Sequence, residues 1–342
     1  MKHFQQTLES LKNSPKSWLI TGVGGFIGSN LLEALLKLNQ KVVGIDNFST
    51  GRKNNLIEVK ALLEVNQWKN FTFYEGDITL IDDCMKVTEG VDFVLHQAAL
   101  GSVPRSVEDP ITSNRSNIDG FLNILEASYK NNVESFTYAS SSSVYGDHPA
   151  LPKEESTIGN LLSPYAVTKY TNELYASVFS SCYDFKSIGL RYFNVFGNRQ
   201  DPNGAYAAVI PRWIESFLSN EEVVIYGDGE TSRDFCFIEN VIQANILAAT
   251  SDPSIKNNIY NIAFGGQTTL NELYKILFNK VKKITGDCES KLRYEHFRPG
   301  DIRHSFADIS NAQNKLLYYP QHGLSEGLDI LLDYELSKRE GN

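Results

Sequence analysis

The stretch WLITGVGGFIGSNLLEALL, residues 18–36, decides the fold of this chain. It opens with a short apolar run typical of a buried strand, and the run from Ile27 to Leu38 has the apolar spacing of a helix. Between the two lie Gly22, Gly25 and Gly28. Glycines at such a turn let the backbone approach a pyrophosphate, and the helix N-terminus offers unpaired N–H donors. A tight turn without a ligand is the alternative, and the flanking strand and helix disfavour it.

The first half of the chain repeats this strand-then-helix pattern. Further strand-like runs are Lys41–Asp46, Phe71–Tyr74, Asp92–His96, Phe136–Tyr138 and Ser187–Arg191. Alternating segments of this length predict an α/β fold, with a doubly wound parallel sheet of the Rossmann type. After about residue 195, loops rich in Gly, Asp and Asn interrupt the pattern, which predicts a smaller, mixed α/β C-terminal lobe.

The predicted parts of the chain are a dinucleotide-binding domain at 17–195, to which about 236–262 returns, a substrate-binding lobe at 196–235 and 263–342, and an N-terminal helical extension at 1–16. In that extension Phe4, Leu8 and Leu11 recur at helical spacing, which predicts an amphipathic helix lying on the body. In the second half, helical patterns return at Ile238–Thr250 and Leu270–Lys280.

Composition excludes several classes of function. The 342 residues carry a net charge of −9, which argues against a nucleic-acid partner or an anionic membrane surface. Four cysteines lie far apart without metal-ligand spacing, so we expect buried thiols in a reducing compartment, with no disulfide framework and no metal. No run has the length of a membrane span, and the first sixteen residues lack the apolar segment of a signal peptide. We therefore expect a cytoplasmic protein without membrane insertion.

Asp46 ends the second strand-like run, shortly after the glycine loop. A carboxylate there accepts hydrogen bonds from an adenosine ribose and repels a 2′-phosphate, so it favours NAD over NADP. Arg52 lies close in sequence and can soften that preference. The alternative for Asp46 alone is an ordinary turn residue, which the preceding glycine loop disfavours.

Tyr165 and Lys169 stand four residues apart, so on a helix they share one face. Tyrosine has a pKa near ~10 and is a poor base at neutral pH. A nearby ammonium and a positive nicotinamide ring would both favour the phenolate. This spacing is also common on protein surfaces, and here its weight comes from following a dinucleotide loop.

Four serines, Ser140–Ser143, follow the strand-like run that ends at Tyr138. Ligands of parallel sheets bind beyond the carboxyl ends of the strands, where this cluster is expected to lie. A hydroxyl there can bridge a reacting sugar hydroxyl and the oxygen of Tyr165. The alternative is a strand exit of small residues that is satisfied by its own backbone.

Seven motifs occur in order along nearly the whole chain: TGVGGFIG, DNFSTG, GDI, HQAA, SSSSVYG, YAVTK and LRYFNVFG. Together they resemble the extended short-chain dehydrogenase/reductases that act on nucleotide sugars. Through HQAALGSVPRS, RYFNVFGNRQDPNGAYAAVIPRW and GDGETSRDF the chain is most similar to UDP-hexose 4-epimerases, especially bacterial UDP-N-acetylglucosamine (UDP-GlcNAc) 4-epimerases of surface-polysaccharide pathways.

That resemblance implies a reaction and a set of site residues. Hydride would pass from C4 of UDP-GlcNAc to tightly bound NAD and return to the opposite face of a 4-keto sugar, giving UDP-GalNAc. The implied catalytic residues are Tyr165, Lys169 and Ser141. The implied cofactor-binding residues are Gly22, Gly25, Phe26, Ile27, Gly28, Asp46, Asn47, Ser49, Thr50, Gly51, Asp77, Ile78, Gln97 and Ser116, with Tyr165 and Lys169. The implied substrate residues are Ser102, Ser141, Ser142, Asn194, Gln200, Tyr206, Arg233, Arg298 and Ser305.

The serine cluster also separates related reactions. Nucleotide-sugar 4,6-dehydratases carry acids just after the catalytic Ser or Thr, because elimination of water needs a general acid and base. UDP-sugar decarboxylases also usually carry an acid here. This chain has Ser142 and Ser143 at these positions, so we expect neither dehydration nor decarboxylation.

Two types of residue bear on the sugar nucleotide. Arg233 and Arg298 suit bidentate contact with a diphosphate, although a single arginine is more often a solvated surface charge. Ser305 matches a position that is bulky in relatives restricted to UDP-glucose and UDP-galactose, and small in those that accept N-acetylated sugars. The sequence therefore favours an acetamido sugar.

Four alternatives stay open. SSSSVYG also resembles UDP-glucuronate 4-epimerases, and relatives differ in whether they accept N-acetylglucosaminuronate. A net NAD-dependent oxidoreductase and a non-catalytic NAD-binding regulator share the same fold.

Relatives usually form homodimers by pairing helices, and the helix of Tyr165 is the candidate for such pairing here.

Overall fold

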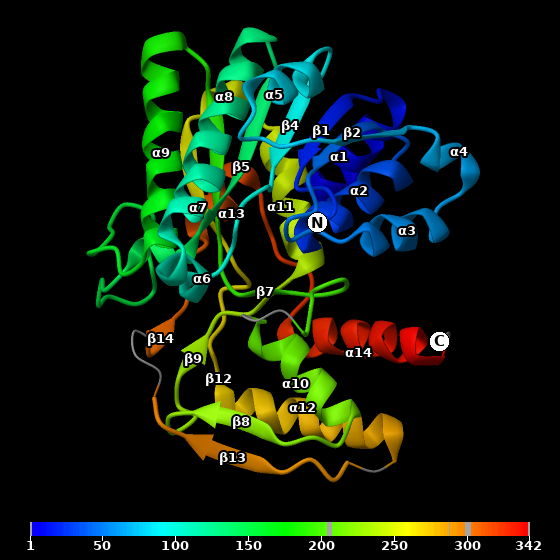
Figure 1. The fold of residues 1–342 in the computed structure, drawn as a ribbon, viewed down its shortest axis with the longest axis vertical. Coiled ribbons are helices and arrows are strands. Elements are labelled where there is room, and N and C mark those ends of the chain that lie inside the picture. Colours follow the sequence, from blue (N-terminus) through cyan, green and yellow to red (C-terminus); the bar gives the residue numbers. More distant parts are fainter. Residues whose placement is uncertain (1, 204–206, 287, 298–301, 341–342) are drawn as a thin grey trace.

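A computed structural model of the chain describes residues 2–203, 207–286, 288–297 and 302–340 (Figure 1). Its centre is a seven-stranded sheet in the order β11-β6-β5-β4-β1-β2-β3, and every pair of neighbours is parallel. The strands are β1 (Ser17–Thr21), β2 (Lys41–Asp46), β3 (Phe71–Glu75), β4 (Phe93–His96), β5 (Ser135–Ser141), β6 (Ser187–Tyr192) and β11 (Asn258–Ile262). This arrangement confirms the predicted doubly wound parallel sheet.

Strand order reverses between β1 and β4. From β1 the chain winds outward through β2 and β3, and then returns to build β4, β5, β6 and β11 on the other side. Parallel sheets open a ligand crevice at this point, beyond the carboxyl ends of the strands. Residues of the glycine loop and of the serine cluster follow β1 and β5 at that edge.

Helices cover both faces of the sheet and bury two separate clusters of apolar side chains. One cluster joins the sheet to α5 (Ile81–Thr88), α8 (Gly120–Lys130) and α9 (Pro164–Tyr183). The other joins it to α1 (Lys2–Asn13), α2 (Phe26–Lys37), α3 (Lys53–Ala61) and α11 (Ile238–Ala249). The short helix α4 (Val65–Trp68) also packs on α2. Both faces of the central strands are therefore buried, as parallel sheets require.

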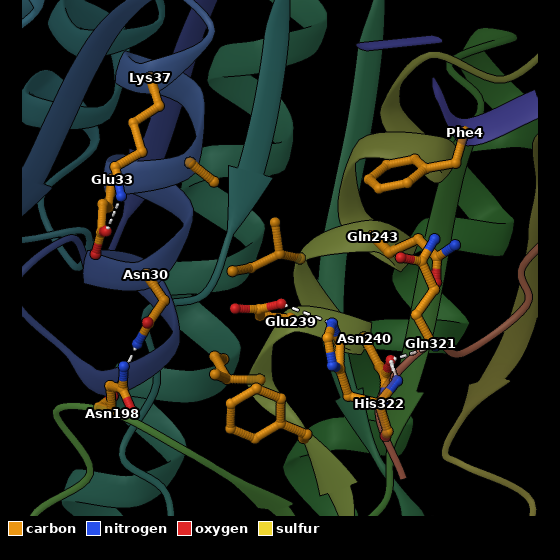
Figure 2. A pocket seen from close by; sticks show the side chains of 14 residues that line it. Phe4, Asn30, Glu33, Lys37, Asn198, Glu239, Asn240, Gln243, Gln321 and His322 are labelled. Atoms are coloured by element: carbon orange, nitrogen blue, oxygen red, sulfur yellow. Dashed lines mark hydrogen bonds and ion pairs between the residues drawn. The ribbon is translucent and has the colours of Figure 1, made fainter. Parts of the chain in front are cut away.

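A cavity of about 260 Å³ lies beside the second helical layer (Figure 2). In Figure 2, α2 contributes Asn30, Glu33 and Lys37, and α11 lies opposite with Glu239 and Gln243.

Short helices connect β4 to α8 and β5 to α9. They are α6 (Val103–Glu108), α7 (Pro110–Asn114), the π-helical turn η1 (Arg115–Asp119) and the 3₁₀ turn η2 (Ser142–Tyr145). A further 3₁₀ turn, η3 (Pro253–Ile255), precedes β11. The π-helical turn runs directly into α8, and such turns are frequent at functional sites.

The rest of the chain forms a lobe beyond the carboxyl edge of the sheet (Figure 1). Its helices are α10 (Val209–Leu218), α12 (Leu270–Thr285) and α14 (Leu324–Glu340). Its strands are β7 (Val195–Phe196) with β10 (Cys236–Phe237), β8 (Val223–Tyr226) with β13 (Leu292–Glu295), and β12 (Thr268–Thr269) with β9 (Ser232–Arg233) and β14 (His304–Ser305). In contrast, α13 (Ser310–Leu316) packs back against β11.

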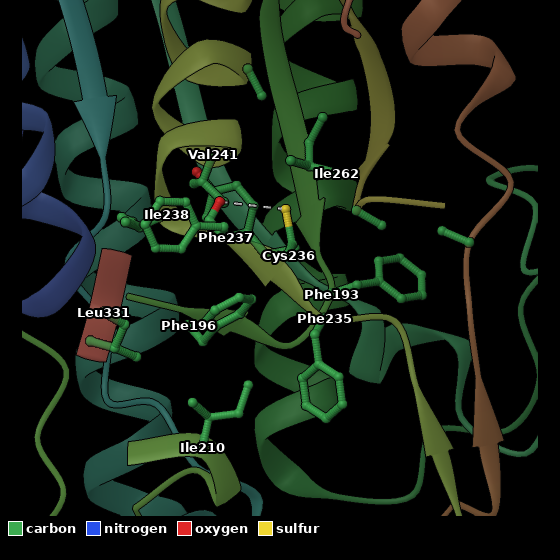
Figure 3. Close-up of a cluster of buried hydrophobic side chains, with 14 of the residues drawn as sticks. Phe193, Phe196, Ile210, Phe235, Cys236, Phe237, Ile238, Val241, Ile262 and Leu331 are labelled. Carbon is green, nitrogen blue, oxygen red and sulfur yellow. Dashed lines mark hydrogen bonds between the residues drawn. The ribbon is translucent and has the colours of Figure 1, made fainter. Parts of the chain in front are cut away.

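A third apolar cluster joins this lobe to the sheet (Figure 3). Ile262 of β11 belongs to it, as do Ile210 of α10 and Leu331 of α14. The rings of Phe196 and Phe237 pack with centroids 5.4 Å apart at its centre. Because buried apolar side chains are continuous between the two parts, the lobe is held firmly against the strand ends.

Two predictions about local structure need correction. The strand predicted to stop at Tyr138 continues through Ser141, because Ser140 and Ser141 pair with β6 in the parallel ladder. The thiol of Cys182 is exposed, whereas the other three cysteines are buried, and all four are free.

The predicted N-terminal helix is confirmed as α1, with Leu11 buried and Phe4 and Leu8 packed on the same cluster as α2. In the part of the chain that the structure describes, none of the helices is both long and apolar enough to cross a membrane.

Candidate active site at the carboxyl edge of the sheet

The turn between β1 and α2 accepts only glycine at two of its positions. Gly22 has a φ of +70°, and a Cβ there would lie 2.9 Å from the backbone of Ala98. A Cβ on Gly28 would lie 2.1 Å from the carbonyl oxygen of Gly22. The N-cap residue of α2, Gly25, supplies no side-chain cap, so the first N–H groups of the helix remain available to an anion.

Beside this turn lies the first cavity of the site, of about 80 Å³, which we call the distal cavity. Predicted cofactor residues that line it are Gly22, Gly25, Asp46, Asn47, Ser49, Thr50, Gly51, Asp77, Ile78, Gln97 and Ser116. The Asp46 carboxylate accepts hydrogen bonds from the backbone N–H groups of Gly24 at 2.8 Å and Phe48 at 2.7 Å, which fix its orientation. Burial raises the pKa of this carboxyl group.

A larger cavity of about 380 Å³ continues from the distal one, and we call it the central cavity. It is lined by Gly22, Gly25, Phe26, Ile27, Gly28, Thr50, Gln97, Ala99, Gly101, Ala139, Ser140, Ser141, Tyr165, Lys169, Tyr192, Asn194 and Val195. The structure thus brings the three predicted catalytic residues, from β5 and α9, to the glycine turn. None of these lining residues is an Asp or a Glu.

The start of α9 is anchored by several hydrogen bonds. Ser163 caps the helix by accepting from the N–H of Ala166, and the N–H of Tyr165 donates to Ser106 Oγ at 3.0 Å. One turn later, Lys169 Nζ donates to the carbonyl oxygen of Ala139 at 2.8 Å. The lysine nitrogen lies 5.9 Å from the centre of the Tyr165 ring.

Burial dominates the ionisation of Tyr165 and Lys169, the two predicted catalytic groups that titrate. It raises the pKa of Tyr165, although a hydrogen bond with Ser141 opposes that shift. It lowers the pKa of Lys169 to about 8, against the opposing charge of Glu173. At Tyr165 burial therefore outweighs the hydrogen bond with Ser141. That the ammonium of Lys169 and a nicotinamide ring together favour the phenolate stays a prediction.

Ser141 and Ser142 differ in their position relative to the central cavity. Ser141 Oγ accepts from the N–H of Ser143 at 3.1 Å and from Ser143 Oγ at 3.0 Å. These bonds leave the proton of the Ser141 hydroxyl free to point toward Tyr165. Ser142 begins the turn η2 and lines neither cavity.

The third cavity of the site, the lobe cavity, measures about 170 Å³ and includes Asn194, which also lines the central cavity. Its other lining residues are Ala207, Val209, Arg212, Trp213, Val224, Tyr226, Thr231, Arg233 and Leu270. Arg233, a predicted substrate residue, is therefore part of this lining. Arg212 was missed, although the sequence places it as a cation in the otherwise apolar run VIPRWI.

Of the remaining predicted substrate residues, those that the structure describes line none of the three cavities. Ser305 pairs with Arg233 in the ladder between β14 and β9 but lines none of the three cavities. Gln200 donates to the carbonyl oxygen of Val195 at 3.1 Å, and Ser102 caps α6. Tyr206 and Arg298 lie outside the described residues.

The cavity of Figure 2 shares no lining residue with these three and contains none of the predicted site residues. His322 contacts Glu239 in it, with Nε2 2.8 Å from Oε2. Within the described residues, no cluster of His, Cys, Asp and Glu side chains could hold a metal ion.

Solved structures of other proteins share this architecture. A UDP-N-acetylglucosamine 4-epimerase from Methanobrevibacter ruminantium, in complex with UDP-N-acetylmuramic acid, is 40% identical, with a TM-score of 0.86 over 95% of this chain and 99% of that one. A UDP-glucose 4-epimerase from Thermotoga maritima, with UDP-glucose, is 35% identical, with a TM-score of 0.85 over 94% and 99%. A UDP-glucuronic acid 4-epimerase from Bacillus cereus, with UDP-glucuronic acid and NAD, is 32% identical, with a TM-score of 0.83 over 94% and 99%.

Residues 18–263 match the family described as the NAD dependent epimerase/dehydratase family. This segment contains the parallel sheet except for Ser17, the first residue of β1, together with the glycine turn and the residues Ser141, Tyr165 and Lys169. The match supports the predicted NAD cofactor and the enzymatic nature of the protein. The chain belongs to the NAD-dependent epimerase/dehydratase family.

Proposed function

We propose that the protein is a 4-epimerase that interconverts UDP-GlcNAc and UDP-GalNAc. The observation that carries this proposal is the central cavity, where Ser141, Tyr165 and Lys169 meet the dinucleotide turn without any lining carboxylate. Reversible hydride transfer needs a proton donor and acceptor at one oxygen, and this set supplies them. Elimination of water would need a further acid and base, which the lining lacks.

Bound NAD would accept hydride from C4 of the sugar and return it. Tyr165 as the phenolate would take the proton of the 4-hydroxyl group as hydride leaves C4, which gives a 4-keto sugar. Ser141, hydrogen-bonded to Tyr165, would hold the reacting oxygen. Lys169, held by the carbonyl oxygen of Ala139, would place its positive charge beside the phenolate. Tyr165 would then return the proton after hydride has come back to the opposite face.

The lobe cavity and the central cavity adjoin, so the 4-keto sugar could rotate between the two hydride transfers. Arg212 and Arg233 of the lobe cavity would bind the diphosphate, since guanidinium groups suit bidentate contact with phosphate oxygens. Asn194 lies where the lobe cavity meets the central cavity. A sugar tethered at its diphosphate could therefore rotate in the central cavity while the nucleotide stays bound. On this proposal, residues 196–235 and 263–342 form the substrate-binding lobe.

Three arguments support the acetamido sugar. The sequence motifs resemble this subtype, and the similar enzyme from M. ruminantium is named a UDP-N-acetylglucosamine 4-epimerase. Ser305 is small and lies beside Arg233 in the ladder. The second candidate substrate class is a UDP-uronate. The B. cereus enzyme, which is 32% identical to this chain, is named a UDP-glucuronic acid 4-epimerase.

We further propose a homodimer that packs through α9. Val167, Leu174 and Val178 are exposed on this helix at positions that share one face. Val107 of α6 and Ile111 of α7 are exposed on neighbouring helices that contact α9.

We propose that the enzyme works in the cytoplasm and supplies precursors for surface polysaccharides such as O-antigen or capsule.

The proposal is tested by adding UDP-GlcNAc to the purified protein without NAD and following the anomeric proton signals by NMR. Appearance of UDP-GalNAc would support epimerisation, acceptance of the acetamido group and retention of the cofactor. Conversion that needs stoichiometric NAD would favour a net oxidoreductase. Activity confined to UDP-glucuronate or UDP-N-acetylglucosaminuronate would replace the substrate. No activity on any of these sugars would overturn the proposal in favour of a non-catalytic NAD-binding protein.

A further inference from the structure

A buried ion pair joins α9 to the sheet next to the catalytic residues. Glu173 lies on α9 one turn after Lys169, Arg191 lies on β6, and both side chains are almost completely buried. The guanidinium group contacts both carboxylate oxygens, with Nε 2.9 Å from Oε1 and Nη2 2.8 Å from Oε2. Such a two-point contact fixes orientation as well as distance.

The same carboxylate holds the first serine of the cluster. Ser140 Oγ donates to Glu173 Oε1 at 2.5 Å, and Ser140 pairs with Arg191 in the ladder between β5 and β6. Ser141 is the next residue of β5, so its side chain leaves the opposite face of the strand. Glu173 therefore fixes β5 at the residue directly before the catalytic serine.

Lys169 is tied to that strand as well. Its ammonium group donates to the carbonyl oxygen of Ala139, and the side chain is buried. Burial lowers the pKa of Lys169, and the negative charge of Glu173 opposes this shift. Glu173 thus reaches the site by two routes, through a hydrogen bond to the strand and through its charge.

Stability alone gives a poor reason for this ion pair. Removing two charges from water costs free energy that their attraction only partly offsets, so apolar replacements of such pairs are often tolerated. We propose that Glu173 and Arg191 are positioning residues for the proposed reaction. Their ion pair holds Ser140, and so aligns Ser141 with Tyr165, while the Glu173 carboxylate keeps Lys169 protonated. This inference rests on the proposed epimerase function and deepens it.

Other ionisable groups near the pair come from neighbouring elements. His96 on β4 is neutral, because burial and the lysine charge lower its pKa to about 3. Burial raises the pKa of Tyr138 on β5 well above its usual value, and raises that of Tyr145, which lies under the Arg191 guanidinium, to about 12. Burial also raises the pKa of Glu155, whose backbone oxygen accepts from Arg191 at 3.2 Å.

The variant Glu173→Gln removes the charge and keeps the size of the side chain. Its readout is the tyrosinate absorbance of Tyr165 against pH, taken as the difference from the same protein carrying Tyr165→Phe. The titration is made on the NAD-bound protein, where the nicotinamide charge adds to that of Lys169 in favouring the phenolate. We expect it to move to higher pH in the variant, because Lys169 is then neutral over more of the range in which Tyr165 ionises. If the pKa of Lys169 falls by about one unit, kcat at pH 8 falls about fivefold with KM unchanged.

Glu33→Gln is the matched control, because it breaks another buried arginine ion pair, to Arg199 at 2.6 Å, away from Lys169. We expect it to lower the thermal midpoint and to leave the tyrosinate titration unchanged. If Glu173→Gln does not fold, the double variant Glu173→Gln/Arg191→Gln removes both charges of the ion pair and serves in its place.

A folded variant with an unchanged tyrosinate titration would overturn the proposal, and a loss of thermal stability alone would assign the pair a structural role. The titration needs no turnover. Its outcome is therefore separate from whether UDP-GlcNAc is the substrate.

Discussion

Ser305 and Arg233 are partners in the parallel ladder between β14 and β9. Arg233 lines the lobe cavity, where we propose that it binds the diphosphate. Ser305, which we propose limits the size of the sugar, therefore lies on the neighbouring strand. On the proposed mode of binding, Ser305 is therefore the ladder partner of the residue that would bind the diphosphate.

Ser305→Tyr is expected to narrow the site beside Arg233. Activity on UDP-GlcNAc should fall by about ten- to a hundredfold relative to activity on UDP-glucose, since a clash with the acetamido group costs roughly 1–3 kcal/mol. The measurement is kcat/KM for both sugars. Ser305→Ala adds no bulk at this position and should leave kcat/KM unchanged for both sugars. Equal losses on both sugars in the tyrosine variant would refute a size gate at this position.

Tyr165→Phe should remove the proton acceptor and donor. We expect kcat to fall by about 10²- to 10⁴-fold, the usual contribution of general acid–base catalysis, with bound NAD retained. NAD content is read from the absorbance of the denatured supernatant. Tyr170→Phe removes a phenol hydroxyl from the same helix and should leave kcat near that of the parent protein. A fully active Tyr165→Phe would exclude this tyrosine from the chemistry.

The rate should depend on the charge of Lys169. Because burial lowers its pKa to about 8, the lysine is protonated below that pH and neutral above it. With bound NAD favouring the phenolate of Tyr165 over this range, we therefore expect kcat to decline as pH rises through 8, by about tenfold near pH 9. Lys169→Arg keeps its charge and should flatten this alkaline limb at a lower overall rate. A wild-type rate that stays constant to pH 10 would contradict the prediction.

Arg233→Ala and Arg212→Ala should weaken binding of the nucleotide sugar. Charge-assisted hydrogen bonds contribute about 1.5–3 kcal/mol, so each variant should raise KM by about ten- to a hundredfold with a smaller effect on kcat. Arg293→Ala, on the exposed strand β13, controls for the loss of one positive charge. Unchanged KM values would move the diphosphate away from the lobe cavity.

Leu174→Arg should disrupt the proposed dimer, because it places a charge in the middle of the exposed apolar face of α9. Light scattering after gel filtration is expected to give the mass of one chain for this variant and of two chains for the parent protein. Leu62→Arg changes an equally exposed leucine at the end of α3 and should leave the dimer intact. A monomeric parent protein would refute the proposal.

Features that depend on neighbouring residues could be read from the sequence. The glycine turn is one, because a positive φ at Gly22 and the close approach at Gly28 follow from a single strand-to-helix connection. Tyr165 and Lys169 are another, because a spacing of four residues fixes them on one helical face. The order of strands and helices followed from the same local periodicity.

Other features depended on packing between distant segments, and the sequence did not reveal them. Arg212 on α10 lines the same cavity as Arg233, which is 21 positions further along the chain. The direction of the Tyr165 pKa shift depends on burial, which spacing does not report.

The serine cluster shows both sides of this division. By itself the sequence determined that hydroxyl groups, and no acids, stand at the end of β5, which favours epimerisation over elimination of water. Only the tertiary structure decided that Ser140 faces Glu173 while Ser141 faces Tyr165. The physical reason is register: the pairing of β5 with β6, and of both with α9, assigns adjacent and chemically identical side chains to opposite faces of one strand.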